Sequence, residues 1–89
     1  MEKDELKVIS ELFGKELRKN RVIERDITQE KFARISGVGP EHIGEIERGI
    51  KLPRIETLLR LYKAGMDINR AFDHMIEELN AMGIDIGKE

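Results

Sequence analysis

The sequence predicts an all-α fold of five helices, formed by residues 1–89 as a single domain. Apolar residues recur at three- and four-residue spacing in five stretches, as they do along the buried face of a helix. No stretch alternates polar and apolar residues in the way of a half-buried strand. A chain of 89 residues can form one modest core but has no room for a separate catalytic lobe. Function should therefore lie on the surface of this core.

The first helix is expected over residues 4–23. Gly14 lies inside it, at a tolerable cost of about 1 kcal/mol relative to alanine. The polar stretch 24–27 follows, and Thr28 is a good N-cap for a second helix over 29–36 because its hydroxyl can accept from a backbone N–H of the first turn. The apolar positions that define the first helix are Leu6, Ile9, Phe13 and Leu17.

Two short helices are expected next. The third covers about 40–47 and starts with Pro40, whose missing N–H costs nothing at the first position of a helix. Gly49 ends it. The fourth covers about 54–64 and stops at Gly65.

The fifth helix is expected over about 68–82, before Gly83 and a short frayed tail. Its apolar stripe is longer than a small five-helix core needs, and the first helix can cover only part of it. The stripe therefore predicts a homodimer interface, although it could also lie wholly inside a monomer. The predicted interface residues are Phe72, Met75, Ile76, Leu79 and Met82.

The second and third helices together, within residues 29–49, have the spacing of a helix-turn-helix. Ala33 is small, as the close approach of two crossing helices requires. Gly37 can adopt a positive φ at the end of the first of them. Ile43 and Ile46 lie three apart and point toward the core, which leaves the opposite face of the third helix free for a partner.

The charge distribution favours nucleic acid more than the net charge of −2 does. Residues 15–25 sum to +3 and residues 48–63 to +4, whereas residues 67–89 sum to −4. Positive charge thus flanks the helix-turn-helix on both sides, as expected if phosphates approach that face. The alternative is that such stretches are ordinary in a protein with 38% charged residues.

Several classes of function have no support in the sequence. Cysteine is absent, which excludes disulfides and thiolate metal sites, and the two histidines, His42 and His74, make no metal-binding pattern. His74 is expected to be an ordinary surface or interface histidine. Ser10 and Ser36 lack a histidine and carboxylate at the spacing of a nucleophilic triad, so neither an enzyme nor a cofactor is expected. No membrane span or basic leader is evident, and a cytoplasmic protein is expected.

From Leu17 to Met66 the pattern L-R-x-x-R … T-Q-E-x-x-A-x-x-x-G-V … I-x-x-I-E-R-G-x-x-x-P … L-x-x-L resembles the lambda-repressor-like (Cro/C1, or XRE) family of helix-turn-helix DNA-binding domains. The resemblance covers a little over half of the chain. It implies a five-helix fold that binds double-stranded DNA sequence-specifically, usually as a dimer, and regulates transcription. A repressor is the expected role.

The resemblance also implies which residues contact DNA. Gln29, at the start of the second helix, would meet a phosphate, while Lys51 and Arg54 would hold the backbone beyond the recognition helix 40–47. The full set is Thr28, Gln29, Pro40, Glu41, His42, Gly44, Glu45, Arg48, Lys51 and Arg54.

The recognition helix departs from the family pattern because it carries two carboxylates toward the major groove. Glu41 and Glu45 must each find a cytosine N4 donor or stay clear of phosphate, and Glu45 is the better candidate for such a contact. His42 could donate to a guanine. The acidic helix also leaves an alternative function open, a protein-interaction module of the antirepressor or antitoxin type that binds a basic protein regulator.

Glu47 is expected to have a different role from the other acidic residues of this helix. In the family the matching glutamate points inward and pairs with an arginine late in the first helix, which here is Arg21. One more residue separates Arg21 from Gln29 than in the commonest family spacing. Such a pair would support the fold, because removal of either partner leaves a partly buried charge without compensation.

Overall fold

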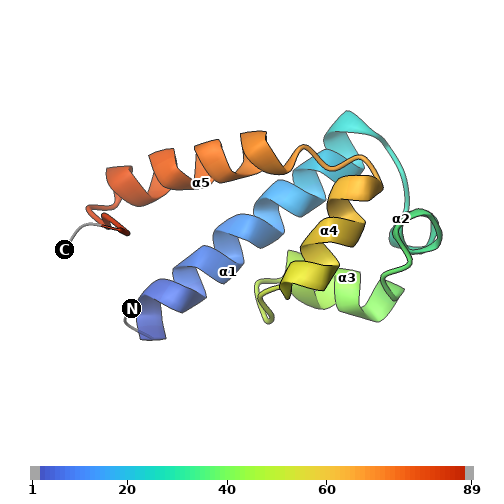
Figure 1. The fold of residues 1–89 in the computed structure, drawn as a ribbon, viewed down its shortest axis with the longest axis horizontal. Helices are drawn as coiled ribbons and strands as arrows, with labels where there is room; N and C mark the ends of the chain where they lie inside the picture. The colour runs from blue at the N-terminus through green and yellow to red at the C-terminus, as the bar shows by residue number, and fades with distance from the viewer. Residues whose placement is uncertain (1–2, 88–89) are drawn as a thin grey trace.

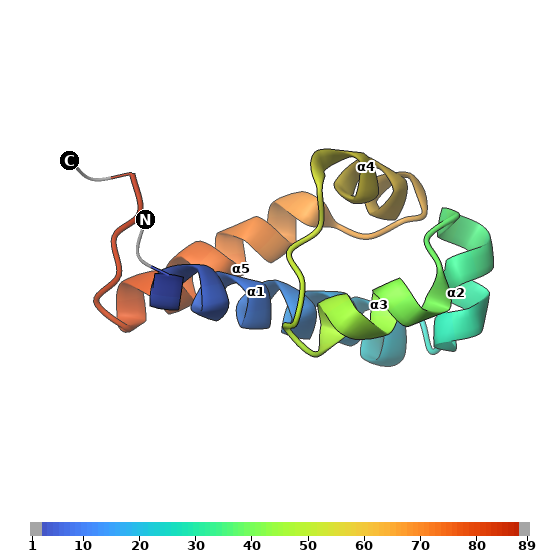
Figure 2. The same cartoon turned by 90° about the horizontal axis from the view of Figure 1, so that it is seen from below.

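The computed structural model describes residues 3–87, which contain five α-helices, one π-helix and no strand. The all-α fold of five helices is therefore confirmed. The long helices α1 and α5 lie side by side, and the three short helices gather toward one end of a body measuring 40 × 22 × 19 Å (Figures 1 and 2). The elements are α1 (Lys3–Arg18), the π-helix η1 (Lys19–Glu24), α2 (Gln29–Ser36), α3 (Pro40–Glu47), α4 (Ile55–Lys63) and α5 (Ile68–Ala81).

The core forms around α1, which packs against both α3 and α5. Every α-helix contributes buried apolar side chains to it. Phe13 of α1 contacts Phe72 of α5, with the ring centroids 6.5 Å apart. The buried apolar residues are Leu12, Phe13, Leu17, Phe32, Val38, Ile43, Ile46, Leu61, Ala64, Met66, Ala71, Met75 and Leu79.

The first helix differs from the prediction in type but hardly in extent. Residues 4–23 were expected to form one α-helix, whereas the chain changes to a π-helix over Lys19–Glu24. A π turn closes i→i+5 hydrogen bonds and so accommodates an additional residue without leaving the helix axis. Asn20 and Arg21 are buried in this turn. Arg25 is its C-cap, and Asp26 follows with φ 51°.

Gly14 marks the closest approach between α1 and α3. A Cβ atom at this position would lie 2.7 Å from the Glu47 carbonyl oxygen and closer still to that of Ile46. Both atoms belong to the backbone of α3, so they cannot move aside as a flexible side chain could. The glycine that sequence reasoning treated as a small cost inside a helix is therefore what lets α3 lie directly on α1.

The helix-turn-helix forms as its spacing predicted. The Thr28 hydroxyl accepts from the Lys31 N–H at 3.0 Å and caps α2. Gly37 has φ 77°, and its N–H donates to the Ala33 carbonyl oxygen at 2.8 Å, which ends α2. Pro40 then opens α3.

The fifth helix requires a correction to the predicted dimer interface. Met75 and Leu79 are only 7% and 2% exposed within the single chain, because this edge of α5 packs into the core. They therefore serve mainly the core of the single chain and form only the floor of the apolar groove on α5. The other three predicted interface residues remain exposed: Phe72, Ile76 and Met82.

The tail after α5 folds back instead of fraying. The Ile84 N–H donates to the Leu79 carbonyl oxygen at 2.8 Å, and the Ile84 side chain packs against the core. Gly83, at φ 80°, makes this reversal possible. The last residues of the predicted frayed tail, Lys88 and Glu89, lie outside the described residues.

Candidate nucleic-acid interface

An ion pair between Arg21 and Glu47 holds the helix-turn-helix against the first helix. The Arg21 Nε donates to Glu47 Oε2 at 2.6 Å, and Nη2 donates to Oε1 at 2.9 Å. The third bond of this guanidinium runs from Nη1 to the Ile27 carbonyl oxygen, at 2.8 Å, in the loop before α2. The two side chains are 10% and 4% exposed, so the predicted pair forms and is shielded from water.

The charge of Arg21 is stabilised by this environment. Its hydrogen bond to Glu47 raises the pKa of the guanidinium, and the nearby charges of Glu47 and Glu30 act in the same direction, while burial opposes them. The net direction is upward from a value that is already strongly basic. Arg21 is therefore a permanent cation in the interior.

Gln29 joins the same network from the start of α2. Its Nε2 donates to Glu47 Oε1 at 3.1 Å, so one carboxylate oxygen accepts from both Arg21 and Gln29. Glu47 thereby connects η1, α2 and α3. The second N–H of the Gln29 amide is left for another acceptor, which is the arrangement that a phosphate contact needs.

The outer face of α3 carries the residues predicted to read bases. Glu41 and Pro40 are exposed, and His42 and Glu45 are partly exposed. The Nδ1 of His42 lies 3.5 Å from Glu45 Oε1, so these two side chains contact each other. A base contact by either residue has to compete with this pair.

Gly44 is a correction to the predicted set of DNA contacts. It is buried, because the side chains of Arg48 and Gln29 lie over it. A Cβ atom here would lie 3.0 Å from Arg48 Nη1 and 3.6 Å from the Gln29 amide. Gly44 thus offers no surface of its own and instead provides the space in which its two neighbours lie across α3.

The remaining predicted contacts are cations that the rest of the chain leaves free. Arg48, Lys51 and Arg54 are all exposed, and within residues 3–87 none of them forms an ion pair. They follow one another along the end of α3 and the connection that leads to α4 (Figure 2). The structure therefore leaves three cations free at the end of α3 and in the connection that follows it.

Sequence reasoning missed the role of Arg25, which it counted only as part of a basic stretch. The Arg25 Nη1 donates to the Ala64 carbonyl oxygen at 2.6 Å, at the end of α4. Its guanidinium also lies 5.5 Å from the centre of the Phe32 ring. The contact joins residues 39 positions apart, so no local pattern could reveal it. Like Arg21, Arg25 therefore makes contacts within the chain that stabilise the fold.

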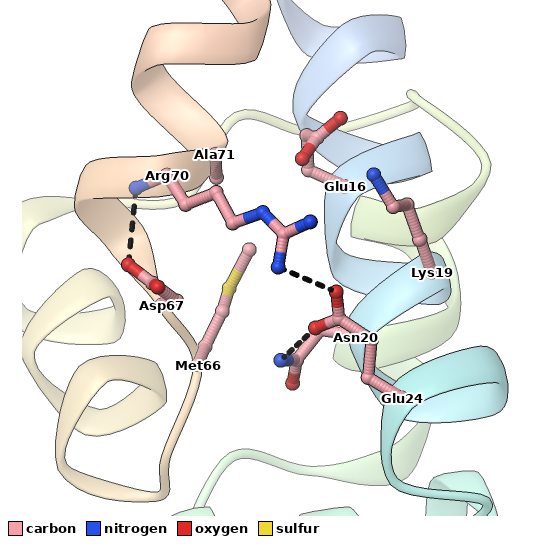
Figure 3. A pocket seen from close by; sticks show the side chains of 8 residues that line it. All are labelled: Glu16, Lys19, Asn20, Glu24, Met66, Asp67, Arg70 and Ala71. Carbon is pink, nitrogen blue, oxygen red and sulfur yellow. Dashed lines mark hydrogen bonds and ion pairs between the residues drawn. The ribbon is translucent and has the colours of Figure 1, made fainter.

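Side chains that line a small pocket between α5 and the end of the first helix connect these two elements. Glu24 Oε1 accepts from Asn20 Nδ2 at 3.1 Å, and Glu24 Oε2 lies 3.5 Å from Arg70 Nη1 (Figure 3). The enclosed volume is about 10 Å³, room for about one water molecule. The pocket is therefore too small for a ligand.

His74 also acts between helices. Its Nδ1 lies 3.2 Å from Glu16 Oε1, which links α5 to α1.

No group of three or more histidine, aspartate or glutamate side chains in the described part of the chain is placed to hold a metal ion. No helix there is long and apolar enough to cross a membrane.

Comparison with known proteins identifies the fold that this geometry builds. The model of a helix-turn-helix family matches residues 15–64, which is more than half of the chain. No curated protein and no solved structure gave a significant match. The matched segment begins inside α1 and ends after α4, so it contains both the Arg21–Glu47 pair and the free cations. The chain belongs to the Cro/C1-type helix-turn-helix family of DNA-binding regulators.

Proposed function

We propose that this protein is a sequence-specific transcriptional repressor that binds double-stranded DNA as a homodimer, with α3 in the major groove. The observation that carries the proposal is the row of free cations, Arg48, Lys51 and Arg54, at the end of α3 and just beyond it. Phosphate contacts supply most of the affinity of such proteins, whatever the base sequence. The buried frame around Glu47 holds α3 in place without using its outer face.

In this proposal Gln29 and Thr28 meet phosphates at the start of α2. The Gln29 amide is already oriented by Glu47, and the Thr28 hydroxyl, which accepts in the cap, keeps its own hydrogen for donation. Glu45 accepts from a cytosine N4 and His42 donates to a guanine once a base separates their contact. Pro40 and Glu41 lie at the edge of this contact area.

The first prediction concerns the backbone contacts. Replacing Lys51 or Arg54 with alanine should weaken binding to specific and random duplexes alike and should reduce the magnitude of the salt slope by about 1 each, because one phosphate contact is lost. The measurement is fluorescence anisotropy with a labelled duplex at several salt concentrations. Lys15→Ala, an exposed lysine of α1 that lines a hollow beside α5, serves as the control. Unchanged affinity in both variants would remove these residues from the interface.

The alternative function is a module that binds a basic protein through α3. It is favoured by the exposed Glu41 and the partly exposed Glu45, two carboxylates on the face that would meet DNA. An electrophoretic titration on random duplex at low and high salt separates the two functions. Absence of binding at low salt would support the protein module, since the cations would then not be acting on phosphates.

The proposed dimer uses the exposed edge of α5. Phe72 and Ile76 line an apolar groove of about 290 Å³ together with Ile9 of α1 and Ile86 of the tail. Met82 extends the exposed apolar surface at the end of α5. A two-fold pair would set two recognition helices about 34 Å apart, one turn of DNA, so that both half-sites are bound together.

Substitutions in α5 should separate association from folding. Ile76→Glu should dissociate the dimer and leave the chain folded, because Ile76 is 43% exposed. Leu79→Glu should instead unfold the chain, because this side chain is 2% exposed within the monomer. Sedimentation equilibrium at micromolar concentration and circular dichroism measure the two effects. Ile23→Glu, at a position 76% exposed on η1, is the control that should change neither. A wild-type chain that stays monomeric with half-sites added would contradict the dimer.

A further inference from the structure

The fourth helix has two apolar faces, and the core uses only one of them. Leu58 and Leu61 face inward. On the outer side Ile55, Leu59 and Tyr62 are 72%, 61% and 64% exposed. Their i, i+4, i+7 spacing places them in one line along the helix. Single exposed apolar residues are ordinary, but a line of three large ones is typical of a contact surface.

A groove lies beside this line, between α2 and α4, and Leu59 is the residue of the line that borders it. Its volume is about 520 Å³. Its apolar part is formed by Leu59 and by Ile35 of α2, which is 47% exposed. Three cations also line it: Arg34, Arg60 and Lys63.

The cations of the groove exceed its acidic residues. Glu56 is the one carboxylate among the lining residues, and it lies 3.9 Å from the Arg60 Nε. Arg34 and Lys63 form no ion pair with any residue between 3 and 87. The groove therefore combines an apolar strip with unneutralised positive charge.

The position of this surface separates it from the two interfaces already proposed. Figure 2 shows α4 on the opposite side of the molecule from α3, and α2 at the end away from the tip of α5. DNA on α3 and a second copy on the far part of α5 would leave the groove open. An apolar strip also offers nothing to a phosphate backbone.

We propose that the groove between α2 and α4 docks an acidic amphipathic helix of a protein partner. The apolar side chains of that helix would pack on Ile35, Leu59 and Tyr62, and its carboxylates would pair with Arg34 and Lys63. The line from Ile55 to Tyr62 is about 10 Å long at 1.5 Å per residue, so a partner helix of two to three turns would cover it. The inference does not depend on the proposed repressor activity.

The test uses a designed probe because the partner is unidentified. The probe is a fluorescein-labelled peptide of about 16 residues, long enough to form a helix, with leucines at i, i+4 and i+7 spacing and glutamates on the flanking positions. A second peptide of the same composition has the leucines dispersed around the helix. Fluorescence anisotropy against the full chain should show saturable binding of the first peptide and much weaker binding of the second.

Substitutions then locate the binding. Leu59→Glu and Lys63→Glu should each weaken binding of the probe by at least about tenfold, the scale of a contact residue at the centre of an interface. Ile23→Glu and Lys15→Glu make the same chemical changes at exposed positions elsewhere and should leave the affinity within about twofold. Circular dichroism establishes that each variant is folded, as their exposed positions imply.

Four outcomes would overturn the inference. Equal binding of the two peptides, or unchanged affinity in the Leu59→Glu variant, would mean that only general charge attraction is present. A Lys63→Glu variant that loses affinity for random duplex but not for the probe would make the groove part of the DNA-binding surface. Self-association that is abolished by Leu59→Glu would assign the line of apolar residues to a second copy of this chain.

Discussion

Replacing Glu47 with alanine should lower the free energy of unfolding by roughly 3 kcal/mol, the scale for removing one partner of a buried ion pair. The substitution leaves Arg21, 10% exposed, with two donors that have no acceptor. It also frees the Gln29 amide from its position at the start of α2. Urea denaturation followed by circular dichroism gives the free energy directly.

The matched control is Glu41→Ala, which removes an exposed carboxylate from the same helix. It should change stability by less than about 0.5 kcal/mol, as for other surface substitutions. Equal unfolding free energies for the two variants would reject the supporting role of the ion pair.

Deprotonating Arg21 by raising the pH is not a practical substitute for the Glu47→Ala substitution. The pKa of Arg21 is raised in the folded chain, chiefly by its hydrogen bond to Glu47. A raised pKa gives stability that is fully present below the unfolded value and is lost only as the pH rises through the folded one. For an arginine that window is strongly alkaline, so its contribution should be constant through the acid and neutral range.

Gly14→Ala should lower the free energy of unfolding by about 2 to 3 kcal/mol, the scale of overpacking in a close-packed interior. Helix propensity alone predicts the opposite sign, a gain of about 1 kcal/mol. The packing effect should dominate because the new Cβ would meet two backbone carbonyl oxygens, those of Ile46 and Glu47. Thermal and urea denaturation of the variant measure the balance.

Gly39→Ala is the control for this substitution. A Cβ at Gly39 has nothing within 4 Å, and its φ of −59° suits any residue. The loss of a favourable N-cap residue at the start of α3 should cost less than about 1 kcal/mol. A Gly14→Ala variant at least as stable as the wild type would show that α1 and α3 can separate slightly at no cost.

Much of the fold could be predicted because its signals are local. Thr28 and Gly37 bound α2 through hydrogen bonds that reach only three or four residues along the chain. The spacing of Ile43 and Ile46 placed both side chains in the core, where they are fully buried. Such features depend on the sequence within one or two turns, and a single sequence contains them.

The rest depends on contacts between distant segments. The π-helix has no apolar period of its own, and the residues that it buries, Asn20 and Arg21, are polar. The apolar stripe of α5 could not be divided by spacing into the buried Leu79 and the exposed Ile76, because both belong to one amphipathic pattern. In the same way, the reason for a glycine at position 14 becomes clear only from the backbone of α3, which lies directly against it.

For the predicted DNA contacts, the sequence indicated the type of each residue but not which side chains lie next to it. The exposure of Lys51 and Arg54 agrees with their expected position beyond the recognition helix. The burial of Gly44 and the contact between His42 and Glu45 depend on side-chain positions that no motif encodes. Resemblance to a family indicates which position of the chain a residue occupies. The side chains that this residue contacts have to be seen in the structure.

The Glu47 carboxylate accepts from Arg21 and Gln29, yet the outward side chains of α3 take no part in that network. In the proposed function, the orientation of α3 and the choice of operator are therefore encoded by separate sets of residues. Glu41, His42 and Glu45 can be exchanged as a group, by natural divergence or in the laboratory, while the same scaffold continues to present them. For the proposed repressor, such an exchange would transfer a different operator preference to the same scaffold.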